Sequence, residues 1–455
     1  MSSSNATVRR VRKDLSADGL ISVIREGFDA IPEPQQRVDQ DISLSDALMS
    51  GFAMFSLKDP SLLAFDERRR DPNDNFRSIY GIQHVPCDTQ MRTILDPIEP
   101  EALYPTFTEI FNRLQRGKGL EAYVFFEGHY LISLDGTGYF SSNKIHCSSC
   151  QEKHHRNGKI SYSHHMLGAS LVHPDVKEVI PLAPEPIIKQ DGDTKNDCER
   201  NATRRWLKRF RQDHPRLPVI IVEDALSSNA PHLDDLREAN VHYIIGVKPG
   251  DHVFLFQHLR DADEAGRTQT LTLVDSATKI VHHYRFNNGV PLNASHADHL
   301  VNVLEYWEIH PDKVVKKVKQ HGTIQYFSWV TDFHLIPDNV DYIMCGGRCR
   351  WKVENETFNT LKNQGYHLEH NYGHGSQNLS VVLVLVLMLA FLVDQVQQRC
   401  CPVFGAALQK RQGNKRSLWE EMRNVFHAFS FDSMADLFEA IIVGFVRQKP
   451  ILNTS

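Results

Sequence analysis

The spacing of apolar residues divides the chain into helical and extended regions. From 43 to 120 the apolar positions recur every three or four residues, between prolines and aspartates, which predicts a helical domain. From 121 the pattern changes, and AYVFFEGHYLISLDGTGYF predicts a strand, a tight Glu-Gly turn and a second strand. Residues 1–42 show neither pattern, and we expect a flexible basic and polar arm there.

Residues 121–250 combine strands with intervening helices. Further strands are predicted in ISYSHHMLGASLV and KEVIPLAPEPI, and they are followed by a basic helix at 197–212. An apolar strand at 217–224, a short helix at 231–240 and a strand at 241–250 come next. Sequential strands followed by alternation predict an α/β fold, in which helices cover the faces of a mixed sheet.

The rest of the chain is predicted to complete this core. TQTLTLVD, KIVHHYRF and GTIQYFSWVTDFHL predict a β-rich insertion at 251–345. The second part of the core is expected at 346–400, and a helical region at 401–455. The apolar run 379–393 has 15 residues, whereas a helix that spans a bilayer needs roughly 20. We therefore interpret it as a buried core helix and expect no contact with a membrane.

Charge and cysteine content narrow the class of protein. The net charge of −5 argues against bulk attraction to nucleic acid, and eight cysteines among 455 residues do not indicate a disulfide scaffold. The N-terminus has no apolar segment after its charges, so we expect a cytoplasmic protein. Five basic islands form either ordinary solvated surface or, together, a phosphate-binding face; they are RRVRK (9–13), RRWLKRFR (204–211), KVVKKVK (313–319), RCRWK (348–352) and KRQGNKR (410–416).

Two aspartates follow predicted strands. Asp135 ends YLISLD and Asp224 ends VIIVED. Ligands of open α/β sheets gather at the carboxyl ends of strands, although either residue alone is also typical of a turn. Glu223 precedes Asp224, and the strand pattern does not decide which of the two faces the site.

A glutamate is predicted to face the core of a helix. At about 100° per residue, Glu354 shares a stripe with Trp351, Phe358 and Leu361. A buried carboxylate without a partner would cost several kcal/mol, so a cation must neutralise it. Three carboxylates suit two Mg²⁺ or Mn²⁺ ions about 3.5–4 Å apart, which is the arrangement used for in-line displacement at phosphorus.

LISLDGTGYF, VIIVEDALSSNAPHL and CRWKVENETFNTLKNQGYHLEHNYGHG resemble segments of the DDE transposases of bacterial insertion sequences, in the cut-and-paste branch with a β-rich insertion. The resemblance covers roughly 45–400 and implies a ribonuclease H-like core. It also implies that Asp135, Asp224 and Glu354 are catalytic metal ligands, and thereby favours Asp224 over Glu223. The 130 positions from Asp224 to Glu354 leave room for the insertion.

The branch signature Y-(2)-R-(3)-E-(6)-K is matched in part. Arg350 stands at the arginine position relative to Glu354, but Gly347 stands where the tyrosine is expected. Leu361 takes the lysine position, with Lys362 one place later. The resemblance implies that Arg350 and Lys362 grip DNA phosphates, while a structural salt bridge is the alternative for each.

The resemblance implies two further DNA contacts. Trp329, in the insertion, would stack on a displaced base, and its alternative is a buried aromatic of the β-rich region. Lys248 ends a strand and would touch DNA beside the site.

A zinc site is predicted separately from these acids. Cys147 and Cys150 form a C-x₂-C pair followed by His154 and His155, with two further histidines in the next strand. This spacing suits a structural Cys₂His₂ zinc site, and ordinary reduced thiols on a loop are the alternative.

Function follows from the resemblance. It implies a Mg²⁺-dependent transposase that is associated with the nucleoid and acts on double-stranded DNA, with water and then a freed 3′-hydroxyl as nucleophiles. The region 43–120 would recognise the terminal inverted repeats, and a homodimer would hold two ends together before joining to target DNA. The alternatives are a transposase-derived DNA-binding protein without catalysis, a metal-dependent nuclease without strand transfer, and a carboxylate-pair glycosidase.

Overall fold

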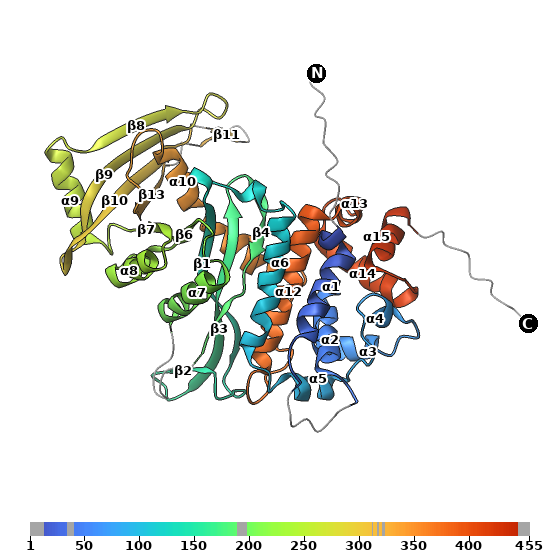
Figure 1. The fold of residues 1–455 in the computed structure, drawn as a ribbon. Helices are drawn as coiled ribbons and strands as arrows, with labels where there is room; N and C mark the ends of the chain where they lie inside the picture. Colours follow the sequence, from blue (N-terminus) through green and yellow to red (C-terminus); the bar gives the residue numbers. More distant parts are fainter. Residues whose placement is uncertain are drawn as a thin grey trace, which may run out of the picture.

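The structure combines a long twisted sheet with a bundle of helices that come from both ends of the chain (Figure 1). It is a computed structural model, and it describes residues 13–33, 41–188, 198–311, 313–315, 318–320 and 324–444.

The main sheet has eleven strands, and the order of nine of them is β2-β3-β1-β6-β7-β13-β10-β9-β8, with β4 and β5 paired to β3. Strands β1, β6 and β7 are parallel, and the other pairs are antiparallel. A mixed sheet was predicted from the sequential strands followed by alternating helices and strands. The strands are β1 (Tyr130–Ser142), β2 (Gln151–His154), β3 (Ile160–His173), β4 (Val176–Pro181), β5 (Glu185–Ile187), β6 (Val219–Glu223), β7 (His242–Gly246), β8 (Gln269–Val274), β9 (Val281–Asn293), β10 (His296–Ile309) and β13 (Ile324–Thr331); β11 (Lys313–Val315) and β12 (Val318–Gln320) form a separate pair.

Helices flank this sheet and form the bundle. They are α1 (Ala17–Asp29), α2 (Leu44–Ser56), α3 (Leu62–Arg68), α4 (Asn75–Ser78), α5 (Asp88–Leu95), α6 (Tyr104–Arg116), α7 (Glu199–Asp213), α8 (Ala230–Glu238), α9 (Val253–Glu264), α10 (Val340–Arg348), α11 (Asn359–Asn363), α12 (Leu379–Cys400), α13 (Pro402–Lys410), α14 (Lys415–Ala428) and α15 (Met434–Val443). Short helical turns are η1 (Lys13–Leu15), η2 (Pro100–Leu103), η3 (Glu121–Tyr123), η4 (Phe126–Gly128) and η5 (Ala225–Ser227), and η6 (Val353–Phe358) is a π-helix.

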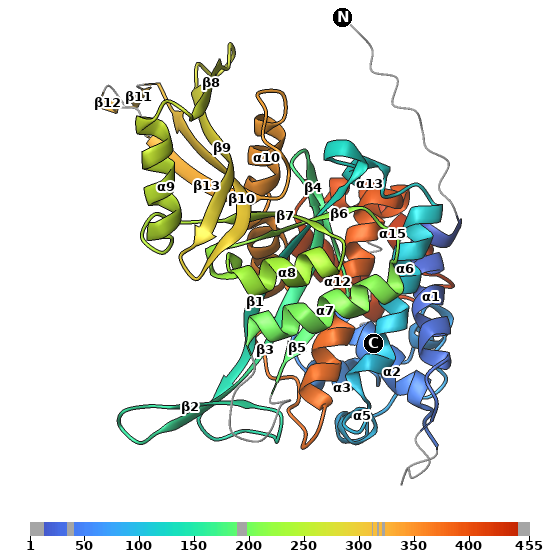
Figure 2. The ribbon, with the colours of Figure 1, turned by 60° about the vertical axis from the view of Figure 1, so that its left-hand side comes forward.

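Helix α12 is the centre of the bundle. It packs against α2 on one side and β4 on the other, so it joins the helical layer to the sheet (Figures 1 and 2). Of the described helices, it alone is long and apolar enough to cross a membrane, and 94% of its most apolar 18-residue window is buried inside the protein. The prediction of a buried core helix is confirmed.

The N-terminal region differs from the predicted arm. Helix α1 begins after Ser16, whose side chain accepts a hydrogen bond from the Gly19 N–H, and it buries Leu20, Ile24 and Phe28 completely. Its apolar face packs on α2 and α6. The prediction of an arm is therefore wrong for α1, while residues 1–12 and 34–40 of that arm lie outside the described residues.

The helices at 43–120 share one core with the C-terminal helices. The side-chain amide of Asn75 donates to the carbonyls of Phe426 and Phe429, and the Arg423 guanidinium donates to the carbonyls of Leu57 and Lys58. These contacts join α4 and the end of α2 to α14, so the N-terminal helices do not stand apart as a separate unit.

The hairpin predicted from 121 forms only in its second half. The segment before β1 folds into the turns η3 and η4 instead of a strand. Glu127 and Gly128 both have positive φ, of 51° and 80°, so the chain reverses tightly there before β1 begins.

The β-rich insertion continues the main sheet. Strand β13 pairs antiparallel with β7, with Trp329 opposite Gly246 and Thr331 opposite Ile244, and β10, β9 and β8 follow outwards. The region also contains α9, which the strand pattern did not predict and which packs on β9 (Figure 2). One hydrogen-bonded sheet therefore links the insertion to the strands that carry the acids.

Candidate active site

Asp135 and Asp224 lie at the same level of two neighbouring parallel strands, β1 and β6. Strand β1 continues past Asp135 to Ser142, so the prediction that a strand ends at Asp135 is wrong. The pairing of β1 with β6 ends at Ser133 and Val222, and each aspartate stands two residues beyond this pair. Neighbouring strands lie about 4.8 Å apart, so the two backbones are close at this level. Asp224 directly follows β6, and its carboxylate accepts the N–H of Leu226 at 2.9 Å.

Glu223 and Asp224 have different environments. Glu223 is buried, and its carboxylate lies 2.5 Å from Nε2 of His232 on α8. Burial favours the neutral imidazole, but the charge and hydrogen bond of Glu223 outweigh it and raise the pKa of His232. Glu223 is thus bound within the fold, whereas Asp224 remains at the strand end.

Glu354 lies in the π-helix η6, where the predicted stripe is only partly realised. Phe358 and Leu361 are buried, but the Trp351 side chain is 43% exposed and the Glu354 side chain 45% exposed. The prediction that all four residues face the core is wrong, because the wider π-helical turn changes the angle between successive side chains. Glu354 lies at the edge of the core, within reach of solvent.

A glycine lets η6 approach the sheet closely. Gly168 on β3 stands opposite Asp135, and a Cβ at Gly168 would lie 2.6 Å from the Phe358 ring. Contacts of this length require the absence of a side chain. The close packing of Phe358 therefore brings the π-helix, and Glu354 with it, over the strand position of Asp135.

Arg350 bridges two of the acids. Its Nη1 lies 3.4 Å from Oδ2 of Asp135 and 2.5 Å from Oε1 of Glu354, and its carbonyl accepts a hydrogen bond from Ser133. Burial and the hydrogen bond with Glu354 raise the pKa of Asp135 to about 7, although Arg350 opposes this. The two carboxylates are close enough to share one cation.

A fourth carboxylate, Glu199, was not predicted. It is the first residue of α7, and its carboxylate lies so close to Gly136 that a Cβ there would overlap with it. Burial, followed by the charges of Asp224 and Glu223, raises the pKa of Glu199. An acid in the first turn of a helix is common, so the sequence carries no special signal for it.

A cleft of about 610 Å³ opens beside Glu199. Glu199 lines it together with Leu226 and Ser227, which are the second and third residues after Asp224. His165 of β3 and Arg200 of α7 line it as well. Asp135, Asp224 and Glu354 are not among the described residues that line this cleft.

Trp329 does not have the environment predicted for it. Its side chain is buried, with 5% of the residue exposed, and a Cβ at Gly347 would overlap with its Nε1. The indole therefore packs on α10 and presents no free face to a base, so the base-stacking prediction is wrong. The same contact explains why a glycine occupies the tyrosine position of the branch signature.

The two predicted lysines have different environments. Lys362 forms an ion pair with Glu369 at 2.9 Å. This agrees with the structural salt bridge that was the alternative to a DNA contact. Lys248 is exposed in the turn after β7.

Several residues of the basic islands bind within the protein. In 204–211, Arg205 and Arg209 both pair with Glu185. Lys352 is buried and donates to three backbone carbonyls. These cations stabilise the fold instead of forming an open basic face. The side chains of the islands at 9–13 and 313–319 lie outside the described residues.

The structure does not bring the four predicted zinc ligands together. His154 is exposed beside Glu152, and His155 lies 2.9 Å from Ser161 through Nε2, so neither faces the thiols. The structure instead brings together Cys147, Cys150, His164 and His374. His374 was missed because it lies far along the chain, between α11 and α12.

Residues 146–392, which are 247 of the 455, match the family model of the transposase DDE domain. The chain belongs to this transposase family. The matched range contains Asp224 and Glu354 and begins after Asp135. No curated protein matches the transposase significantly. The predicted family is thus confirmed, and the large mixed sheet flanked by helices agrees with a ribonuclease H-like transposase fold.

Proposed function

We propose that this transposase cleaves and joins DNA by metal-dependent phosphoryl transfer, with Asp135, Asp224 and Glu354 as the ligands of two Mg²⁺ or Mn²⁺ ions. The observation that carries the proposal is the convergence of acids from three elements. Asp135 and Glu354 contact one guanidinium, and Asp224 follows the strand next to Asp135. Carboxylates crowded in this way repel one another unless cations lie between them.

The donor set fits such ions. All the side chains offered are carboxylates, and Mg²⁺ and Mn²⁺ prefer oxygen ligands and retain waters on their remaining positions. Arg350 supplies one positive charge against Asp135, Glu354 and the nearby Asp224, so negative charge remains to attract divalent ions. Glu354 is half-exposed at the edge of the core, so its side chain can turn toward an ion.

Each residue has a role in the reaction. Bound ions would supply Lewis-acid stabilisation of the phosphoryl group and would activate the attacking oxygen. Asp135 and Asp224 would fix the ligand positions on the sheet, and Glu354 would close the set from η6. Arg350, when its carboxylate contacts are replaced, would donate two parallel hydrogen bonds to a phosphate. No protein nucleophile is needed, since water and then the DNA 3′-hydroxyl attack phosphorus.

The partner is double-stranded DNA carrying the terminal inverted repeats, and later target DNA. Lys248 and Lys362 are proposed phosphate contacts, Lys362 after release of Glu369. A homodimer would hold two element ends together. Two related functions share every acid named above: DNA binding without catalysis, and cleavage without joining.

The test is a cleavage assay with purified protein, Mg²⁺ and DNA that carries the inverted repeats flanking the gene. Nicking should be lost, by at least about 100-fold, in Asp135→Asn, Asp224→Asn and Glu354→Gln, while each variant still binds the DNA. Glu356→Gln, on the same π-helix, is the matched control and should cleave normally.

The outcomes separate the three functions. Unchanged nicking in one of the acid variants removes that residue from the site. Specific DNA binding with no nicking by the unmodified protein identifies a regulator and overturns the catalytic proposal. Nicking without joined products identifies a nuclease and overturns strand transfer.

A further inference from the structure

Four side chains with metal-binding atoms converge away from the acids. Cys147 and Cys150 come from the loop between β1 and β2, His164 from β3, and His374 from the loop before α12. Their ligand atoms all lie within 4.8 Å of one another. Cys150, His164 and His374 are buried, and Cys147 is half-buried.

The distances match those around one tetrahedral ion. Zinc–sulfur bonds of about 2.3 Å and zinc–nitrogen bonds of about 2.0–2.1 Å place two sulfurs about 3.8 Å apart and a sulfur and a nitrogen about 3.5 Å apart. The two sulfurs of Cys147 and Cys150 are 3.8 Å apart. Nε2 of His164 is 3.4 Å from each sulfur, and Nε2 of His374 is 3.3 Å from the Cys150 sulfur.

A disulfide or a set of ordinary hydrogen bonds would fit the cluster less well. A disulfide needs about 2.05 Å between sulfurs, well below the 3.8 Å observed. Both imidazoles turn Nε2 to the thiols, and the Nδ1 atoms of His164 and His374 are buried without a hydrogen-bond partner among the described residues. Interactions at Nδ1 therefore do not account for the orientation of the two rings.

We propose that Cys147, Cys150, His164 and His374 bind one structural Zn²⁺ ion. The set contains two thiols and two imidazoles and no carboxylate, which suits Zn²⁺ and not the Mg²⁺ expected at the acids. Four protein ligands complete a tetrahedron and leave no position for a substrate, so the ion has a structural role.

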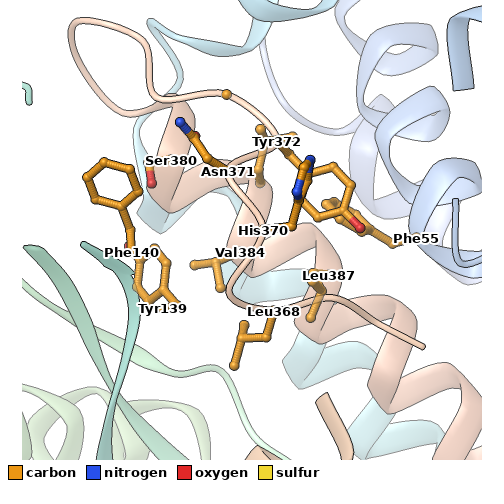
Figure 3. A pocket seen from close by; sticks show the side chains of 12 residues that line it. Phe55, Tyr139, Phe140, Leu368, His370, Asn371, Tyr372, Ser380, Val384 and Leu387 are labelled. Atoms are coloured by element: carbon orange, nitrogen blue, oxygen red, sulfur yellow. The ribbon is translucent and has the colours of Figure 1, made fainter. Parts of the chain in front are cut away.

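The ion would connect two segments that hold the acids. His374 follows η6 and α11 along the chain, while β1 carries Asp135. The ring of Phe140, on β1, packs on His374 with centroids 4.3 Å apart. Figure 3 shows that the loop before His374 lines one pocket together with Tyr139 and Phe140 of β1 and side chains of α12. Zinc would fix this loop to β1 and thereby support the position of η6.

The experiment measures metal in the purified full-length protein, independently of DNA cleavage. Elemental analysis should find about one zinc per chain after dialysis against a weak chelator. Cys147→Ser and His374→Ala should lose the zinc, whereas His154→Ala and Cys198→Ser, which change an exposed histidine and an exposed thiol, should keep it. Removal by a strong chelator should lower the melting temperature, and Zn²⁺ but not Mg²⁺ should restore it.

A second measurement keeps the proposal falsifiable if a variant fails to fold. Co²⁺ added to the metal-free protein should give the visible absorption of a tetrahedral site with thiolate ligands, and Cys147→His should keep metal but weaken the thiolate band. Three results would overturn the proposal: protein that takes up no zinc when reduced, zinc retained in both Cys147→Ser and His374→Ala, or a disulfide between Cys147 and Cys150 in protein purified without oxidant. Because none of these readouts depends on cleavage, the zinc proposal and the catalytic proposal fail separately.

Discussion

Replacing Arg350 by glutamine tests whether its guanidinium lies where a divalent cation would bind. In the metal-free protein Arg350 neutralises Asp135 and Glu354 at 3.4 and 2.5 Å. At an effective dielectric constant of about 20, these distances correspond to attractions of about 5 and 7 kcal/mol. Most of this attraction is offset, because the two carboxylates repel each other. The three side chains are also 22–45% exposed, so solvent and salt screen their charges.

We therefore expect Arg350→Gln to destabilise the metal-free protein by about 1–2 kcal/mol, near the lower end of charged hydrogen bonds. Added Mg²⁺ or Mn²⁺ should restore the stability, since a ligand at 100 times its Kd contributes about 2.7 kcal/mol. The variant should gain more from the ion than the unmodified protein, because no guanidinium then competes for the carboxylates. Urea unfolding with and without the ion measures both effects.

Arg348→Gln is the matched control. Arg348 pairs with Glu308 at 2.7 Å through a similarly exposed side chain. Its loss should also lower stability, but divalent ions should stabilise this variant no more than they stabilise the unmodified protein. Equal stabilisation of Arg350→Gln and the unmodified protein by Mg²⁺ would refute the idea that the guanidinium and the ion share one place.

Two further predictions concern packing and pH. Gly347→Tyr should lower the free energy of unfolding by about 1–3 kcal/mol, because the added Cβ would overlap with Trp329 Nε1. Trp329→Ala in the same chain should recover part of this loss, and chemical denaturation measures both effects. The Glu223 carboxylate raises the pKa of His232 despite burial, so the protonated imidazole is favoured in the fold. This stabilisation is fully present below the unfolded pKa near 6.5 and is lost as pH rises through the folded pKa. The difference in unfolding free energy between the unmodified protein and His232→Gln should therefore shrink from pH 6 to pH 9, and a difference that grows would contradict the pair's role.

Local patterns predicted much of the core. The basic helix at 197–212, the apolar strand at 217–224 and the apolar helix at 379–393 all formed, because each has a periodicity that its own residues determine. Helix α1 was missed because it lies between polar and charged segments, although Ser16 provides an ordinary N-cap.

The candidate site was less accessible to sequence reasoning. The π-helical turn that carries Glu354 has no simple sequence signature. The assumption of 100° per residue therefore placed Trp351 toward the core, whereas the structure shows that it is exposed. His374 joins Cys147 only through the folding of the chain between them, and the nearer His154 was the natural choice from spacing. Glu199 likewise approaches Gly136 only when α7 packs on the sheet.

The burial of α12 has a consequence for how the protein is made. Its mean hydropathy of 2.6 over 18 residues is within the range of segments that insert into bilayers. Its main packing partners α2 and β4 precede it in the chain, and domains assemble from the N-terminus during synthesis. By the time the ribosome releases α12, these two partners have already been translated. A nascent chain that lacked α2 would expose the same segment to the targeting machinery of the membrane.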